Sequence, residues 1–106
     1  MEQINELLRA ELAQLINEYT EFNNGLITIT RVKCSPNLRE ATIFVSVLPE
    51  NMNGTALSAL RRSNHTLSSQ LKKRIKIKYI PRFNWKIDNT EQEADKLEKA
   101  IIEMNQ

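Results

Sequence analysis

The 106-residue sequence contains a single cysteine, a single histidine, two glycines and three prolines. One cysteine excludes an internal disulfide and a metal site built from several thiolates. The scarcity of glycine and proline argues against a disordered or low-complexity chain. No apolar run reaches the roughly 18 residues that a membrane-spanning helix needs. The N-terminal stretch is acidic and helical in pattern, unlike a signal or transit peptide. We therefore expect one cytoplasmic domain over residues 1–106.

Charge is distributed unevenly along the chain, although the net charge is only +2. Residues 1–25 carry five glutamates and one arginine, and residues 87–106 carry six acids and two lysines. Residues 26–86 carry twelve lysines or arginines and only two glutamates. A basic middle between acidic ends suggests a surface for a polyanion, but a run of one sign is equally often only a solvated face.

Apolar periodicity predicts the first half of the fold. Apolar residues recur at intervals of three and four from Ile4 to Tyr19, which is typical of an amphipathic helix. Strands are expected over residues 26–34 and 41–48, with a turn at residues 35–37. The second strand is almost continuously apolar or β-branched, which predicts a central and buried position.

A second helical stripe, interrupted by a polar residue, follows these strands. Thr55 is the expected N-cap, and the stripe continues to about residue 73. Asn64 stands where an apolar residue would fall, within six residues (61–66) that include no apolar one. Either one helix carries a polar notch or two helices meet here. We expect two helices with a break between residues 62 and 66, because Ser, Asn and Thr side chains compete for backbone groups. The apolar positions are Leu57, Leu60, Leu67 and Leu71.

Residues 74–87 alternate between apolar and mostly cationic side chains. This alternation predicts a long third strand with one apolar and one basic face. Pro81 restricts that strand to a sheet edge or a bulge. Phe83 and Trp85 fall on the apolar face and are expected in the core. Residues 90–93 have capping-box form, and a terminal helix is expected after them.

The predicted order is α-β-β-α-α-β plus a C-terminal helix, in an α+β domain. The crossover between the second and third strands is long enough to make that pair parallel. We therefore expect a three-stranded mixed sheet in the order 1-2-3, with the helices on one face.

Four stretches of the chain, taken together, resemble one known family. They are RAELAQLI (9–16), LITITRV (26–32), SPNLREATIFVSVL (35–48) and ALSALRRSNHTLSSQLKKRIKIKYIPRFNW (56–85). In this order and spacing they resemble bacterial ribosome-binding factor A over almost the whole chain. The resemblance implies a type II KH-like domain that binds the 16S rRNA of the immature 30S subunit. It also implies help with late rRNA processing and folding, a role in cold adaptation, and no catalysis.

The resemblance also bears on the segment between the two expected helices. KH domains ordinarily clamp nucleotides with a Gly-x-x-Gly loop at this place. The family instead has an Ala-x-Gly kink, where this sequence has Ser63-Asn64-His65. Without the glycine, His65 would have to adopt the strained or left-handed geometry that a kink requires.

The candidate RNA-binding residues lie around this kink and along the basic segment after it. Both the charge pattern and the resemblance favour them, and they are expected to contact 16S rRNA in a protein that is monomeric when free. They are Arg61, Arg62, Asn64, His65, Lys72, Lys73, Arg74, Lys76 and Lys78.

No catalytic residue, metal site or cofactor is expected. His65 has no nucleophile or positioned partner near it in sequence. Glu91, Glu93 and Asp95 are spaced so that a helix divides them between its faces. Two other functions remain open: a protein-interaction domain whose basic face docks an acidic partner, and a small enzyme whose acid–base pair the sequence does not reveal.

Overall fold

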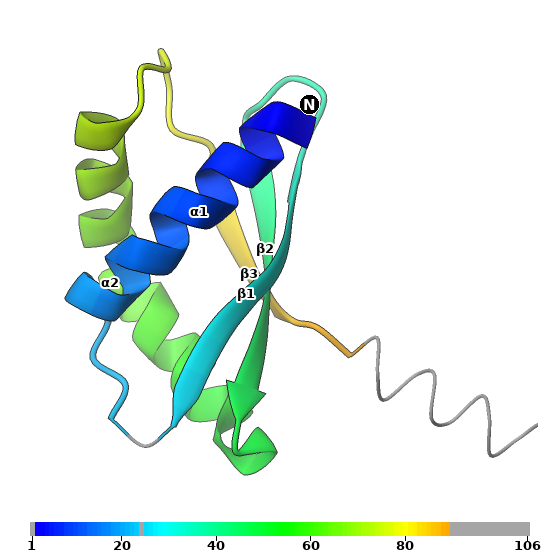
Figure 1. Cartoon of the computed structure of the whole chain (residues 1–106), viewed down its shortest axis with the longest axis vertical. Helices are drawn as coiled ribbons and strands as arrows, with labels where there is room; N and C mark the ends of the chain where they lie inside the picture. The colour runs from blue at the N-terminus through cyan, green and yellow to red at the C-terminus, as the bar shows by residue number, and fades with distance from the viewer. Residues whose placement is uncertain (1, 24, 90–106) are drawn as a thin grey trace, which may run out of the picture.

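A computed structural model of the chain describes residues 2–23 and 25–89. Its elements in chain order are α1 (Glu2–Tyr19), β1 (Leu26–Cys34), β2 (Glu40–Leu48), the 3-10 turn η1 (Glu50–Met52), α2 (Asn53–Arg74) and β3 (Arg82–Ile87) (Figure 1). The predicted C-terminal helix lies outside the described residues.

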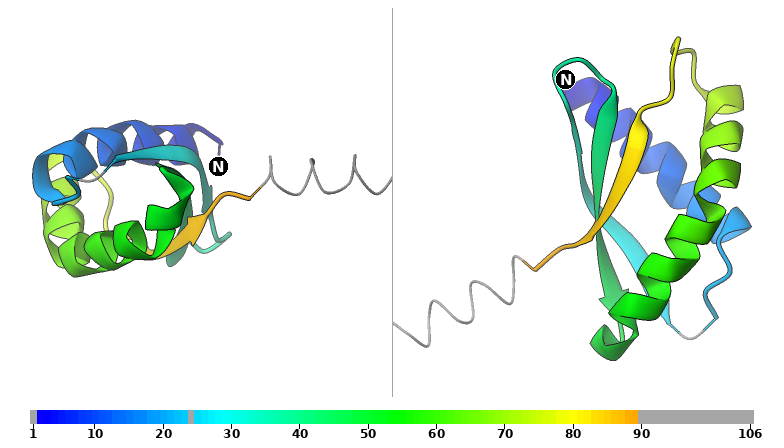
Figure 2. Two further views of the ribbon diagram at one scale, coloured as in Figure 1. Left: turned by 90° about the horizontal axis from the view of Figure 1, so that it is seen from below. Right: turned by 180° about the vertical axis from the view of Figure 1, so that it is seen from behind.

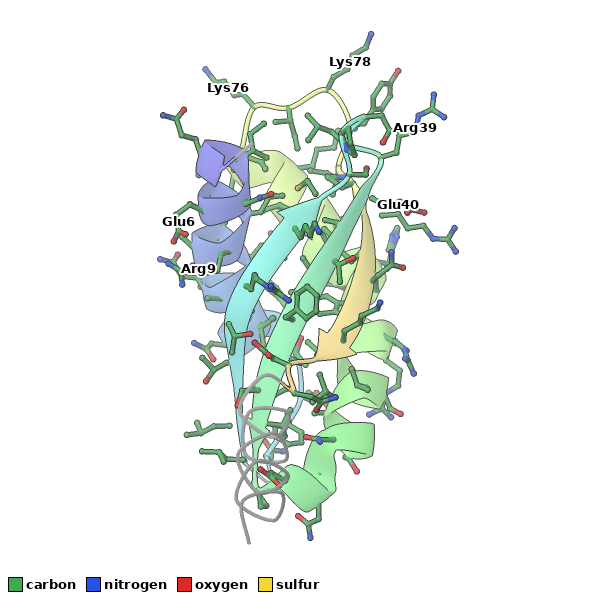
Figure 3. All side chains as sticks on the ribbon, turned by 90° about the vertical axis from the view of Figure 1, so that its right-hand side faces the viewer. Glu6, Arg9, Arg39, Glu40, Lys76 and Lys78 are labelled. Carbon is green, nitrogen blue, oxygen red and sulfur yellow. The ribbon has the colours of Figure 1, made fainter. Side chains whose placement is uncertain are left out.

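The three strands form one mixed sheet with β2 in the centre, as the sequence predicts. β1 pairs with β2 antiparallel, and β3 pairs with β2 parallel. Both helices pack on the same face of the sheet, and no other element within residues 2–23 and 25–89 covers the opposite face, which we call the open face (Figures 2 and 3). The predicted α+β class, strand order and one-sided helix layer are confirmed.

The hydrophobic core lies between the sheet and the two helices. Leu8, Leu12 and Leu15 of α1 are fully buried. The inward side of β2 and the apolar stripe of α2 meet them there. Phe83 and Trp85 are core residues, as predicted, and their rings make an edge-to-face contact with centroids 5.7 Å apart.

A β-bulge in β1 corrects the phase of its side chains. Ile29 pairs with Val45 and Arg31 with Phe44, so Thr30 is an extra residue in β1. Ile29 and Val32 differ by an odd number of positions, and a regular strand would send them to opposite faces. The bulge brings both into the core and leaves Arg31 exposed over the ring of Phe44, 4.1 Å from its centroid.

The predicted break in the crossover is wrong, because α2 is one continuous helix. It starts at Asn53, directly after η1, with Met52 rather than Thr55 as its N-cap. Among the described residues other than glycine, Leu38 alone has a positive φ, so His65 does not adopt the left-handed geometry of a kink. Hydrogen bonds to other groups of the protein allow the polar side chains of residues 63 and 64 to be accommodated within the helix. The Ser63 hydroxyl donates to the carbonyl of Ala59, 3.0 Å away.

The third strand is shorter than predicted. It begins at Arg82, and residues 75–81 form an irregular connection back from the end of α2. Pro81 has no N–H to donate to a sheet partner, so pairing starts at Arg82, whose N–H donates to the Arg39 carbonyl at 2.8 Å. Ile75 is buried as the alternation predicts, but Tyr79, which falls on the same apolar side of that alternation, is 73% exposed.

Candidate RNA interface

The outer side of α2 carries a double row of basic residues. Arg61 and Lys72 are eleven residues apart, close to three helical turns, so they lie on the same side of the helix. The same spacing aligns Arg62 with Lys73. All four are exposed, and none of them forms an ion pair with another described residue. The rows extend for about 16 Å along the helix axis, at 1.5 Å per residue. His65 is also exposed and lies one turn beyond Arg61.

Two further lysines continue this positive charge beyond the end of α2. Lys76 and Lys78 are exposed on the 75–81 connection and project from one end of the molecule (Figure 3). Ile75 is buried, while Ile77 is half-buried and packs on the core. The apolar side chains thus fix this irregular segment, which keeps both lysines in solvent. We call the exposed cations of α2 and this connection the basic surface: Arg61, Arg62, Lys72, Lys73, Lys76 and Lys78.

Arg74 is not part of this surface, because its guanidinium turns toward α1. It donates to Gln14 at 3.0 Å and forms ion pairs with Glu18 at 3.2 Å and Glu11 at 3.5 Å. Sequence alone placed Arg74 with the other cations. The structure shows that this one is already held by acceptors on the neighbouring helix.

Asn64 also has a partner inside the protein. Its side-chain oxygen accepts a hydrogen bond from the indole N–H of Trp85, at 3.1 Å. Trp85 is 6% exposed, and a buried indole N–H requires an acceptor. This requirement accounts for the polar residue in the apolar stripe of α2. A tryptophan predicted in the core was the signal that such an acceptor must exist.

A shallow hollow of about 310 Å³ connects the basic surface to the sheet edge. Arg61 and Lys86 line it together with Asn64 and the aromatic residues of β3. Lys86 was not among the predicted site residues. Lys86 follows the inward-facing Trp85 in β3, so its side chain points away from the core. This alternation was the available signal that Lys86 is exposed.

Four other exposed basic residues were not among the predicted site residues. Arg31, Lys33 and Arg82 are exposed on the open face of the sheet, away from the helices. Arg39 is exposed in the turn between β1 and β2, at the same end of the molecule as Lys76 and Lys78 (Figure 3).

Groups suited to covalent or metal chemistry are not clustered in the part of the chain that the structure describes. No group of three His, Cys, Asp or Glu side chains there is arranged to hold a metal ion. Cys34 is buried, and burial raises the pKa of its thiol, which keeps the thiol protonated. None of the described helices has the length and apolar content needed to cross a membrane.

Comparisons with known proteins agree on one family. A family model described as ribosome-binding factor A matches residues 1–101. Ribosome-binding factor A of Chlamydia muridarum is 31% identical over 108 aligned positions, which cover 98% of this chain and 81% of the relative.

Solved structures show the same fold. The crystal structure of ribosome-binding factor A from Thermus thermophilus superposes with a TM-score of 0.71 at 23% identity, covering 80% of this chain and 91% of that one. A Thermus thermophilus model fitted into a cryo-EM map of a 30S–RbfA complex superposes with a TM-score of 0.70 at 24% identity, with the same coverage of both chains.

Proposed function

Because the chain belongs to the ribosome-binding factor A family, we propose that it binds the small ribosomal subunit through 16S rRNA. In this proposal it assists the late processing and folding of that RNA in the immature particle and catalyses no reaction. It acts as a monomer in the cytoplasm and contributes to growth in the cold. The observation that carries the proposal is the basic surface: six exposed cations without an ion pair to any other described residue.

The chemistry of the basic surface suits phosphate rather than a particular base sequence. Lysine and arginine side chains in solvent contact phosphate oxygens and release the counterions condensed on the RNA. Such contacts position a protein on folded RNA but carry little sequence information. Recognition of the immature subunit would then come from the shape of the RNA, which fits a factor that leaves when that shape changes.

The acidic helix α1 restricts the orientation in which the protein can bind RNA. It lies beside α2 on the same face of the sheet (Figures 1 and 2) and carries four glutamates against one arginine. Like charges repel, so a phosphate backbone that approaches the basic surface is kept away from α1. The protein would therefore dock in one orientation even without base contacts.

The test is sedimentation of the protein with immature and with mature small subunits at several salt concentrations. We expect co-sedimentation with the immature particle that weakens steeply as salt increases, since about six phosphate contacts imply a slope of log affinity against log salt of roughly −4 to −5. Absence of binding at low salt would contradict the proposal. Binding to deproteinised 16S rRNA distinguishes an RNA site from an acidic ribosomal protein.

A further inference from the structure

The end of the molecule that carries Lys76 and Lys78 also contains a groove of about 690 Å³. It lies between the β1–β2 turn, the 75–81 connection and the start of α1. Its volume falls within the range of pockets that hold a small organic ligand and is too small for a protein domain. The lining residues are Ile4, Asn37, Leu38, Arg39, Ile77, Lys78, Tyr79, Ile80 and Pro81.

The floor of the groove is apolar and firmly held. Ile77 and Ile80 are half-buried and pack against the core, and Pro81 is buried. Tyr79, in contrast, has 73% of its surface exposed, although it lines the groove. The ammonium of Lys78 lies 5.6 Å from the centroid of the Tyr79 ring. An exposed aromatic ring beside an apolar floor, with a cation next to it, is the arrangement on which nucleobases stack.

The opposite wall is a rigid turn that holds a leucine in an unfavourable conformation. Leu38 has φ 58°, in the left-handed region that a leucine rarely adopts. Hydrogen bonds fix the turn around it: the Leu38 N–H donates to the Ser35 carbonyl at 2.9 Å, and the Arg39 N–H donates to the Asn37 side chain at 3.1 Å. The turn thereby keeps Leu38 in the groove and Arg39 at its rim.

The charge at the rim has one sign. Among the described residues that line the groove, the charged ones are Arg39 and Lys78, and neither forms an ion pair with another described residue. A ligand for this groove combines a flat apolar group with adjacent negative charge. An unpaired nucleotide of single-stranded RNA has this combination, because its base is planar and its phosphates flank it.

We propose that the groove binds an unpaired base of single-stranded RNA, stacked on Tyr79, with flanking phosphates at Arg39 and Lys78. The inference rests on the proposed function and adds to it a site that distinguishes single-stranded from paired RNA. A paired base is stacked within its helix and cannot enter the groove. The basic surface would supply affinity for phosphate, while the groove would select regions of the rRNA that are not yet paired.

The experiment compares two probes by fluorescence anisotropy at one salt concentration. The first is a single-stranded RNA of about eight nucleotides, within the site size of small single-strand-binding folds. The second is its abasic counterpart, which keeps the sugar–phosphate chain and its charge. We expect the wild-type protein to prefer the RNA with bases by about 5- to 150-fold, the value of one stacked base.

Variants of Tyr79 assign that preference to the groove. Tyr79→Leu should remove the preference and leave the affinity for the abasic probe unchanged, whereas Tyr79→Phe should retain the preference. Tyr19→Leu is the matched control, because Tyr19 is 39% exposed and lies at the far end of α1. It should change neither affinity. Far-UV circular dichroism confirms that each variant is folded.

Three results would overturn the inference. Equal wild-type affinity for both probes means that no base is bound, even if small-subunit binding remains and the proposed function stands. A loss of preference in Tyr19→Leu equal to that in Tyr79→Leu means that the groove is not the site. Small-subunit binding that depends on Tyr79, without any discrimination between the probes, means that the groove holds a protein segment.

Discussion

The outer surfaces of the two helices differ in charge, although both helices cover the same face of the sheet. α1 carries four glutamates and one arginine, and α2 carries five lysines or arginines and no acid. Where the two helices meet, Arg74 of α2 is held by Glu11, Gln14 and Glu18 of α1. Elsewhere on α2 the cations face solvent. The same residue type therefore links two helices in one place and leaves its charge available to a polyanion in another.

The largest effect is expected when three cations on the outer side of α2 are neutralised, which tests whether this side of the helix binds RNA. Arg62, Lys72 and Lys73 are replaced together by glutamine, which is a good helix former. Each lost phosphate contact removes about 0.7 log units of affinity at about 0.1 M salt, so we expect small-subunit affinity to fall about 100-fold. The measurement is a sedimentation titration with immature small subunits.

The matched control neutralises three cations on the open face of the sheet: Arg31, Lys33 and Arg82. The net charge of the protein changes by the same amount, but the basic surface is untouched. We expect this control to bind within about threefold of the wild type, since charges beyond a Debye length are largely screened. An equal loss in both variants would mean that net charge, rather than the basic surface, determines binding.

The inner side of α2 provides the second test. Asn64→Leu keeps the size of the side chain but leaves the Trp85 indole N–H without an acceptor. We expect the free energy of unfolding to fall by about 2 kcal/mol, the usual penalty for a buried donor that loses its partner. Urea denaturation measures it. In a Trp85→Phe background, which has no indole N–H, the same substitution should cost about 2 kcal/mol less, and an equal cost in both backgrounds would show that this hydrogen bond contributes nothing.

A third test concerns the continuity of α2 at His65. Within a helix, glycine is about 1 kcal/mol less favourable than alanine, whereas in a left-handed kink glycine is the better residue. We therefore expect His65→Gly to unfold more easily than His65→Ala by about 1 kcal/mol in urea. If His65→Gly were the more stable of the two, the result would support the helix break that the sequence pattern predicts and contradict a continuous α2.

The smallest expected effect concerns the contact between the helices. Arg74→Gln removes two ion pairs whose side chains are 27–51% exposed. Partly exposed pairs of this kind contribute little, so we expect a loss of about 0.5–1 kcal/mol in unfolding free energy that shrinks at high salt. Calorimetry at two salt concentrations checks this. A stability loss that is independent of salt would mean that Arg74 acts through packing.

Periodicity predicted the parts of the fold that depend on burial. The strands at 26–34 and near 41–48, their order, and the parallel third strand all follow from apolar patterning and crossover length. The Thr30 bulge was not predictable in the same way, because two sets of apolar residues in one strand differ in phase and only pairing with β2 resolves the conflict.

Local sequence patterns were least informative where a side chain has a partner far away in sequence or where the chain leaves a regular strand. Asn64 suggested a broken helix because its partner, Trp85, is 21 positions away. Arg74 was grouped with the other cations because its acceptors lie on α1, 56 to 63 positions away. Tyr79 continued the alternation of a strand, but the chain is irregular there and the ring is exposed. Local patterns indicate burial, and tertiary contacts decide which polar groups remain available.

The salt dependence of small-subunit binding tests the central claim most directly, namely that the basic surface contacts phosphate and Arg74 does not. The wild type, Lys76→Gln/Lys78→Gln and Arg74→Gln are each titrated over a range of salt concentrations. We expect a wild-type slope of log affinity against log salt of roughly −4 to −5, reduced in magnitude by about one unit for each lysine removed and unchanged in Arg74→Gln. An unchanged slope in the double variant, or a reduced slope in Arg74→Gln, would contradict the account.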